Sequence, residues 1–185
     1  VEQHLKRIGK ISLPPIQHIA AASETTHYRN KLEFTFSSKK YFTKEEIIDL
    51  KLPEGEKLGL PSIPALGFHV PGAFDKVIDI DECFLQQEPS NSIRNQLRTF
   101  VLEKGFGFYD IRNHTGLMRN LMIRTCTTGE LMVNVVFGEN IQEQIVEVMN
   151  FIKSTFPEIT SLYYTVNTKF NDSIFDQTPM LFNGN

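Results

Sequence analysis

The strongest constraint on the fold is a short alternating run that follows an Arg-Asn pair. After Arg29-Asn30, apolar and polar residues alternate from Leu32 to Ser37. This spacing predicts a β-strand that buries one face and leaves the other polar. A second Arg-Asn pair, Arg119-Asn120, lies in a similar run over 117–126. The chain is therefore expected to be built on a β-sheet.

The remaining patterns alternate between strands and helices. A capping box of Thr43 and Glu46 opens a short helix, Pro89-Ser90 opens a second, and a third is expected over about 139–155. Turns are expected at Gly59, Pro61 and Pro64 and at Thr127-Thr128-Gly129-Glu130, and further strands at 65–70, 76–80, 131–137 and 161–167. This order predicts an α+β fold, an antiparallel β-sheet with helices packed on one face, in two weakly related ββαβ-like lobes.

The domain boundaries follow from the breaks in these patterns. Residues 1–26 are predicted to be a helix tail and a connector, and 27–170 to be one domain with lobes of about 27–107 and 108–170. Residues 171–185 are polar and irregular, which is typical of a linker, here toward a further domain. Because the chain starts at Val1 without an initiator Met, we expect a piece of a longer protein.

Composition excludes several classes of protein. No run approaches 18 consecutive apolar residues and no secretory signal is visible, so we expect no membrane partner. Two Cys in 185 residues indicate a reduced setting and a cytoplasmic location. The net charge of −3 is not that of a generic nucleic-acid binder, although Lys and Arg gather locally. Such clusters can make a basic face on an acidic protein, but a solvated surface is the commoner explanation.

No enzyme motif is visible in the sequence. There is no Gly-rich dinucleotide or phosphate loop, and the five His are scattered. Two distant Cys do not provide the spacing of a structural zinc site. Cys83, after Asp79, Asp81 and Glu82, is either a buried small hydrophobe or a metal ligand whose companions lie outside the chain. Cys126 is expected to serve packing.

Four basic residues are expected on strands rather than on loops: Arg29, Lys31, Arg119 and Arg124. Strand-borne cations can position a phosphate backbone, with aromatic rings nearby to stack on bases. The alternative is that the Arg-Asn pairs satisfy backbone carbonyls where strands begin. Both interpretations stay open at this point.

Several segments resemble the RNA uracil-5-methyltransferase family, especially members that act on 23S ribosomal RNA. They keep the family's order over roughly residues 1–138, and they are Tyr28-Arg29-Asn30-Lys31, Leu66-Gly67-Phe68-His69, Val77-Ile78-Asp79-Ile80-Asp81-Glu82-Cys83, Glu88-Pro89-Ser90-Asn91, His114-Thr115-Gly116-Leu117-Met118-Arg119-Asn120 and Gly129-Glu130-Leu131-Met132-Val133-Asn134.

The resemblance implies that this chain is the central domain of such an enzyme. The full protein would carry an N-terminal RNA-binding barrel and a C-terminal catalytic domain that binds S-adenosylmethionine, so this segment alone would be inactive. Cys83 matches the remote fourth ligand of a [4Fe–4S] cluster whose other three Cys lie upstream. The implied partner is RNA, most of all 23S rRNA in rRNA processing. The expected RNA or docking contacts are Arg29, Lys31, Arg119 and Arg124, followed by His69 and Arg112.

Two alternatives remain at the level of the sequence. The parent protein could methylate uridine in transfer RNA instead of 23S rRNA. The domain could also be a structural scaffold for the catalytic domain that touches no RNA.

Overall fold

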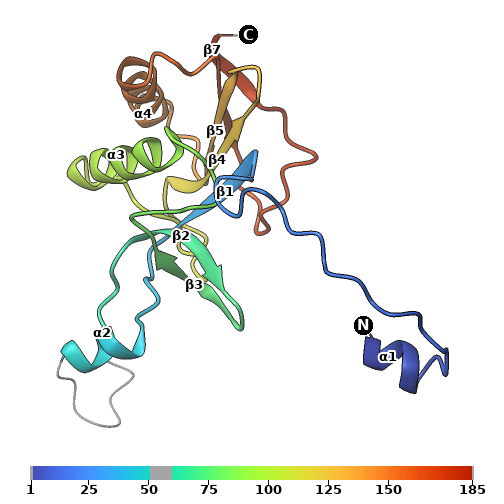
Figure 1. Ribbon diagram of the computed structural model, residues 1–185. Coiled ribbons are helices and arrows are strands. Elements are labelled where there is room, and N and C mark those ends of the chain that lie inside the picture. The colour runs from blue at the N-terminus through green and yellow to red at the C-terminus, as the bar shows by residue number, and fades with distance from the viewer. Residues whose placement is uncertain (1, 51–59, 185) are drawn as a thin grey trace.

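The computed structural model describes residues 2–50 and 60–184, and the expected turn at Gly59 lies outside them. The fold is α+β, with seven strands in one sheet and helices on one of its faces among the described residues (Figure 1). The strand order is β3-β2-β1-β4-β5-β6-β7. The strands are β1 (Lys31–Ser37), β2 (Ala65–Val70), β3 (Ala73–Asp79), β4 (Met118–Thr125), β5 (Leu131–Phe137), β6 (Ser161–Val166) and β7 (Met180–Gly184). The helices are α1 (Glu2–Arg7), α2 (Lys44–Asp49), α3 (Ser90–Glu103) and α4 (Gln142–Thr155).

The predicted alternation in β1 determines which face of the sheet is buried. Leu32, Phe34 and Phe36 are buried, while Lys31 and Glu33 on the other face are exposed. β1 pairs antiparallel with both β2 and β4, so it lies inside the sheet and joins the strands of the two predicted lobes. The buried face of β1 therefore becomes part of one continuous core.

Helices α3 and α4 cover that buried face (Figure 1). In both helices the apolar residues recur at helical spacing, so they form one apolar stripe along the helix. This stripe packs against the sheet. Phe100 of α3 and Phe151 of α4 stack with ring centroids 4.1 Å apart and planes 8° apart. The fully buried apolar residues of the two helices are Ile93, Leu97 and Val101 of α3 and Ile145, Val148, Met149 and Ile152 of α4. We call this side of the sheet the helix face and the other side the open face.

The sheet departs from the antiparallel prediction at one pair of strands. β6 runs parallel to β5, with Met132 opposite Ser161 and Phe137 opposite Val166. The reason is the crossover through α4, which returns the chain to the end of the sheet where β5 began. The other strand pairs are antiparallel, and the turn containing Gly129 joins β4 to β5 as predicted.

The tail that was expected to be irregular contains a further strand. Met180 to Gly184 forms β7, which pairs antiparallel with β6 at the edge of the sheet.

The helix expected from about residue 139 begins later, at Gln142. The capping box of Thr43 and Glu46 is confirmed, because each side chain accepts a hydrogen bond from the backbone N–H of the other.

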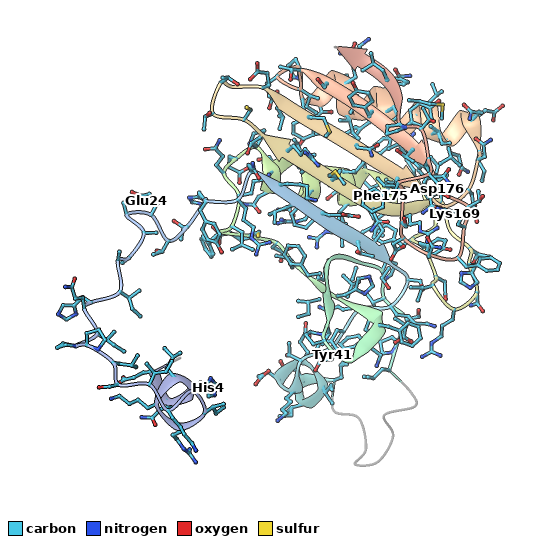
Figure 2. The ribbon with its side chains drawn as sticks, turned by 90° about the vertical axis from the view of Figure 1, so that its right-hand side faces the viewer. His4, Glu24, Tyr41, Lys169, Phe175 and Asp176 are labelled. Carbon is cyan, nitrogen blue, oxygen red and sulfur yellow. The ribbon has the colours of Figure 1, made fainter. Side chains whose placement is uncertain are left out.

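The N-terminal segment projects away from the sheet. Helix α1 and the connector that follows it extend to one side of the body, and His4 and Glu24 mark this segment in Figure 2. No residue of α1 is buried, and the connector is exposed almost throughout. The chain joins the body where the backbone N–H groups of His27 and Arg29 donate to the carbonyls of Phe84 and Leu85. Every helix of the described residues is too short or too polar to cross a membrane.

Candidate nucleic-acid interface

The open face of the sheet carries a large hollow. Its floor is two rows of neighbouring side chains across β1, β4, β5 and β6, and its roof is the segment 172–179. The volume is about 690 Å³, within the size range of small-molecule sites. We call this hollow the sheet pocket. One row is Glu33, Met122, Asn134 and Tyr163, and the other is Lys31, Arg124, Met132 and Ser161.

The roof belongs to a longer segment, residues 167–179, which we call the strap. Arg119 of β4 holds it in place. The Arg119 guanidinium donates to the backbone carbonyls of Asn167 and Lys169, both at 2.6 Å, and of Asn171 at 2.7 Å. It also pairs with Asp172 at 2.9 Å and lies 4.3 Å from the centre of the Tyr109 ring. Arg119 is only 1% exposed, so it positions the strap and presents no free cation to a ligand.

Two smaller hollows continue the sheet pocket toward the connector. The first, of about 260 Å³, shares Lys31, Arg124 and Met132 with the sheet pocket. The second, also about 260 Å³, shares Cys126 with the first and reaches Tyr28 and Arg29. Each hollow shares lining residues with the next one, and we call the three hollows together the groove.

Three of the six predicted RNA-binding residues meet in this groove: Arg29, Lys31 and Arg124. Lys31 and Arg124 are cross-strand partners on β1 and β4, and all three residues are exposed. Within residues 2–50 and 60–184, none of the three forms a salt bridge. Cations left without a protein partner can bind the phosphates of a nucleic acid.

Two acidic side chains in the sheet pocket, Glu33 and Asp172, reduce its positive charge. Glu33 keeps part of its surface exposed, but partial burial of its carboxyl raises the pKa of Glu33 above its ordinary value. Lys31 opposes this shift and Asp172 adds to it. Asp172 is bound to Arg119. The pocket therefore offers cations at one end and a carboxyl beside the apolar floor.

His69 and Arg112 do not line the groove. His69 is exposed on β2. Arg112 donates from Nε to Asp75 at 2.6 Å, and its guanidinium lies 5.0 Å from the centre of the Phe74 ring. The structure thus brings together Arg29, Lys31 and Arg124, places Arg119 behind the strap, and separates His69 and Arg112 from this group.

The two thiols occupy opposite environments. Cys83 is buried, and Asn91 accepts from its N–H at 2.9 Å and donates to its carbonyl at 3.3 Å. An iron–sulfur cluster takes four ligands, and the described residues hold no group of three or more His, Cys, Asp or Glu side chains suited to a metal. These residues therefore do not by themselves fit a cluster, and Cys83 as a remote ligand stays a prediction.

Cys126 was expected to serve packing, and this was wrong. It lies in the turn after β4, exposed to solvent, and lines two hollows of the groove. Hydrogen bonding by Thr128 lowers the pKa of the Cys126 thiol below its ordinary value. The turn follows the end of the strand, so the alternation that buries residues within β4 no longer applies to it.

Sequence reasoning missed the sheet pocket. The outward positions of Met122, Met132 and Asn134 could be read from the alternation of β4 and β5. No local signal places Ile174 and Phe175 over the sheet, because the contacts of Arg119 that hold the strap join residues 48 to 53 positions apart.

Comparisons with known proteins agree with the resemblance seen in the sequence. An uncharacterized RNA methyltransferase of Bacteroides thetaiotaomicron is 45% identical over 188 residues, covering 100% of this chain and 40% of that protein. One of Porphyromonas gingivalis is 43% identical, covering 100% and 39%. The chain is therefore similar to part of these proteins named RNA methyltransferases. It spans about 40% of the length of these curated relatives.

The fold is also found in a solved structure. The crystal structure of Pyrococcus abyssi tRNA (uracil-54, C5)-methyltransferase, in complex with S-adenosyl-L-homocysteine, matches with a TM-score of 0.53 at 21% identity. The match covers 82% of this chain and 30% of that one, and it shows a shared fold. No protein-family model matches the chain.

Proposed function

We propose that this chain is the central, RNA-binding domain of an S-adenosylmethionine-dependent RNA uracil-5-methyltransferase. The observation that carries the proposal is the groove, where Arg29, Lys31 and Arg124 lie beside exposed aromatic rings and form no salt bridge with another described residue. Such a surface suits single-stranded RNA, since cations contact phosphates and rings stack on bases. The relatives named as RNA methyltransferases support the class of reaction.

In this proposal the domain binds and orients RNA and performs no chemistry. A catalytic Cys outside this chain would attack uracil C6, a methyl group would pass from S-adenosylmethionine to C5, and proton removal from C5 with elimination of the Cys would complete the reaction. The groove would hold the RNA on either side of the target uridine. Cytoplasmic location and a cluster through Cys83 remain predictions.

The first candidate substrate is 23S rRNA, which rests on the sequence resemblance. Transfer RNA is the second candidate, favoured by the structural similarity to a tRNA (uracil-54, C5)-methyltransferase. The test supplies the full-length protein, purified without oxygen, with S-adenosylmethionine and each unmodified RNA. Mass spectrometry of the digested RNA should find 5-methyluridine in 23S rRNA, whereas these 185 residues alone should give none.

The groove itself is tested by charge reversal. We expect Lys31→Glu and Arg124→Glu to weaken the binding of a single-stranded RNA at least about tenfold and to lower its salt dependence. Lys153→Glu is the matched control, because Lys153 is exposed on α4 on the helix face. Unchanged affinity in both groove variants, with an intact fold, would favour a scaffold domain that touches no RNA.

A thiol probe gives an independent readout. Cys126 is exposed in the groove and Cys83 is buried. Bound RNA should slow the reaction of Cys126 with a thiol reagent in the native protein. A rate that RNA leaves unchanged would place the RNA elsewhere on the molecule.

A further inference from the structure

The floor of the sheet pocket contains apolar side chains, which a site that binds only phosphates would not need. Met122 and Met132 present half-buried thioethers from β4 and β5. Ile174 of the strap lines the same hollow, and Phe175, which also lines it, is fully exposed. Figure 2 shows Phe175 lying with Lys169 and Asp176 of the strap over the sheet. An apolar slot beside an exposed ring suits a flat aromatic ligand.

The polar groups of the pocket are arranged along the same floor. Glu33, Met122, Asn134 and Tyr163 are successive cross-strand partners in one row. The Thr165 hydroxyl donates to Asn134 Oδ1 at 3.2 Å, which orients the amide and leaves its nitrogen as the donor. An acceptor, Glu33, and a donor, Asn134, thus flank the thioether of Met122.

The neighbouring row supplies positive charge. Lys31 and Arg124 are paired in register, and Met132 and Ser161 continue the row. The pocket thus combines a slot for a ring, hydrogen-bonding groups for its edge, and two cations for an adjacent phosphate. These are the three parts by which proteins recognise unstacked bases in single-stranded RNA.

We propose that the sheet pocket holds one unstacked nucleotide of the bound RNA, separate from the uridine that is methylated. The base lies between the two Met of the floor and the strap, with Phe175 stacking at the rim. Glu33 and Asn134 contact the base edge, and Lys31 and Arg124 contact the adjoining phosphate. This inference rests on the proposed function, since it assigns the RNA of that function a second anchoring point.

The decisive test maps contacts directly. The protein is irradiated at 254 nm with a 12-nucleotide single-stranded RNA of random sequence, and cross-linked peptides are identified by mass spectrometry. We expect cross-links at Phe175 and Tyr163. Cross-links confined to Tyr28 and its neighbours would overturn the nucleotide pocket and leave RNA binding intact. An absence of cross-links and of RNA affinity would instead overturn the proposed function.

Affinity measurements give the second arm. We expect Phe175→Ala to weaken RNA binding at least about fivefold while leaving its salt dependence unchanged, because a stacking contact is lost and no charge is removed. The matched control is Phe74→Ala, on β3 at the opposite edge of the sheet and 61% exposed. Equal effects of the two substitutions would overturn the assignment.

A third arm separates RNA from free nucleotides. A mixture of the four nucleoside monophosphates is added as competitor to the protein with the same RNA. We expect competition only at concentrations far above that of the RNA, because the oligonucleotide is also held by the rest of the groove. Competition by mononucleotides at equal concentration would assign the pocket to a free nucleotide and overturn its role in RNA binding.

Discussion

At the scale of single residues, Arg119 shows how a cation predicted for a ligand can serve the fold. Its planar guanidinium has five N–H donors in a fixed fork, which suits several carbonyls arranged around it. Here that fork meets the carbonyls of Asn167, Lys169 and Asn171 and the carboxylate of Asp172. The roof of the sheet pocket therefore depends on a buried residue that lies behind it.

Replacing Arg119 should loosen the strap. We expect Arg119→Ala to lower the free energy of unfolding by about 3–5 kcal/mol, because it removes the charged donor that three carbonyls and a carboxylate share. Arg119→Lys should recover only part of this loss, since one ammonium cannot reproduce the fork. Urea denaturation measures the effect, with the exposed Arg124→Ala on the same strand as the control, expected within about 0.5 kcal/mol of wild type. Equal losses in Arg119→Ala and Arg124→Ala would contradict this role.

Glu33 predicts a pH dependence. Its folded-state pKa is raised by burial of the carboxyl, so its contribution to stability is fully present below the ordinary Glu pKa and is lost as pH rises through the folded pKa. Glu33→Gln should therefore be more stable than wild type at neutral pH, by less than about 1 kcal/mol because the residue stays partly exposed to solvent. Urea denaturation across acidic and neutral pH measures the difference, which should shrink as pH falls. A difference that grows toward acid would contradict the assignment.

At the scale of elements, the sheet separates stability from binding. The helix face is covered by α3 and α4, whereas the open face carries the groove. Substitutions between the helices should therefore change stability and leave RNA affinity alone.

The stacked rings of Phe100 and Phe151 test this separation. Phe151→Ala should destabilise the protein by about 1–3 kcal/mol, less than a fully buried Phe, because the ring is only half-buried. RNA affinity measured well below the melting temperature should stay within about twofold of wild type. A matched loss of affinity would show that the helix face also takes part in binding.

The elements differ in how far the sequence predicts them. β1 and the hairpin of β4 and β5 follow from local alternation and a Gly-containing turn, both of which need only neighbouring residues. The parallel orientation of β6 and the short edge strand β7 depend on where the chain returns to the sheet, which no local pattern records. For the same reason Arg29, Lys31 and Arg124 could be predicted as a set of cations, while the groove that they line could not.

At the scale of the whole molecule, the N-terminal segment is separate from the sheet. Residues 2–26 bury nothing in the body, whose contacts with this part of the chain begin at His27. Stability should therefore reside in the part of the chain that follows.

Removal of residues 1–26 tests this separation. The shortened protein should unfold within about 0.5 kcal/mol of the full chain in urea, because no buried apolar surface is lost. Its RNA affinity should also be unchanged, since Arg29 is retained. A larger drop in stability would mean that the segment packs against the body in solution.

The cross-strand register has a mechanical consequence. Lys31, Arg124, Met132, Ser161 and Gly184 follow one another across the sheet, so the body is entered at β1 and left at β7 from the same end. A pulling force between these two points runs across the strands, along the hydrogen bonds that join them. Such a load breaks bonds one at a time, and the edge strand β7 should peel away first at low force. β7 directly follows the strap in the chain. Detachment of β7 would therefore free the C-terminal end of the strap, which forms the roof of the sheet pocket, while the core stays folded.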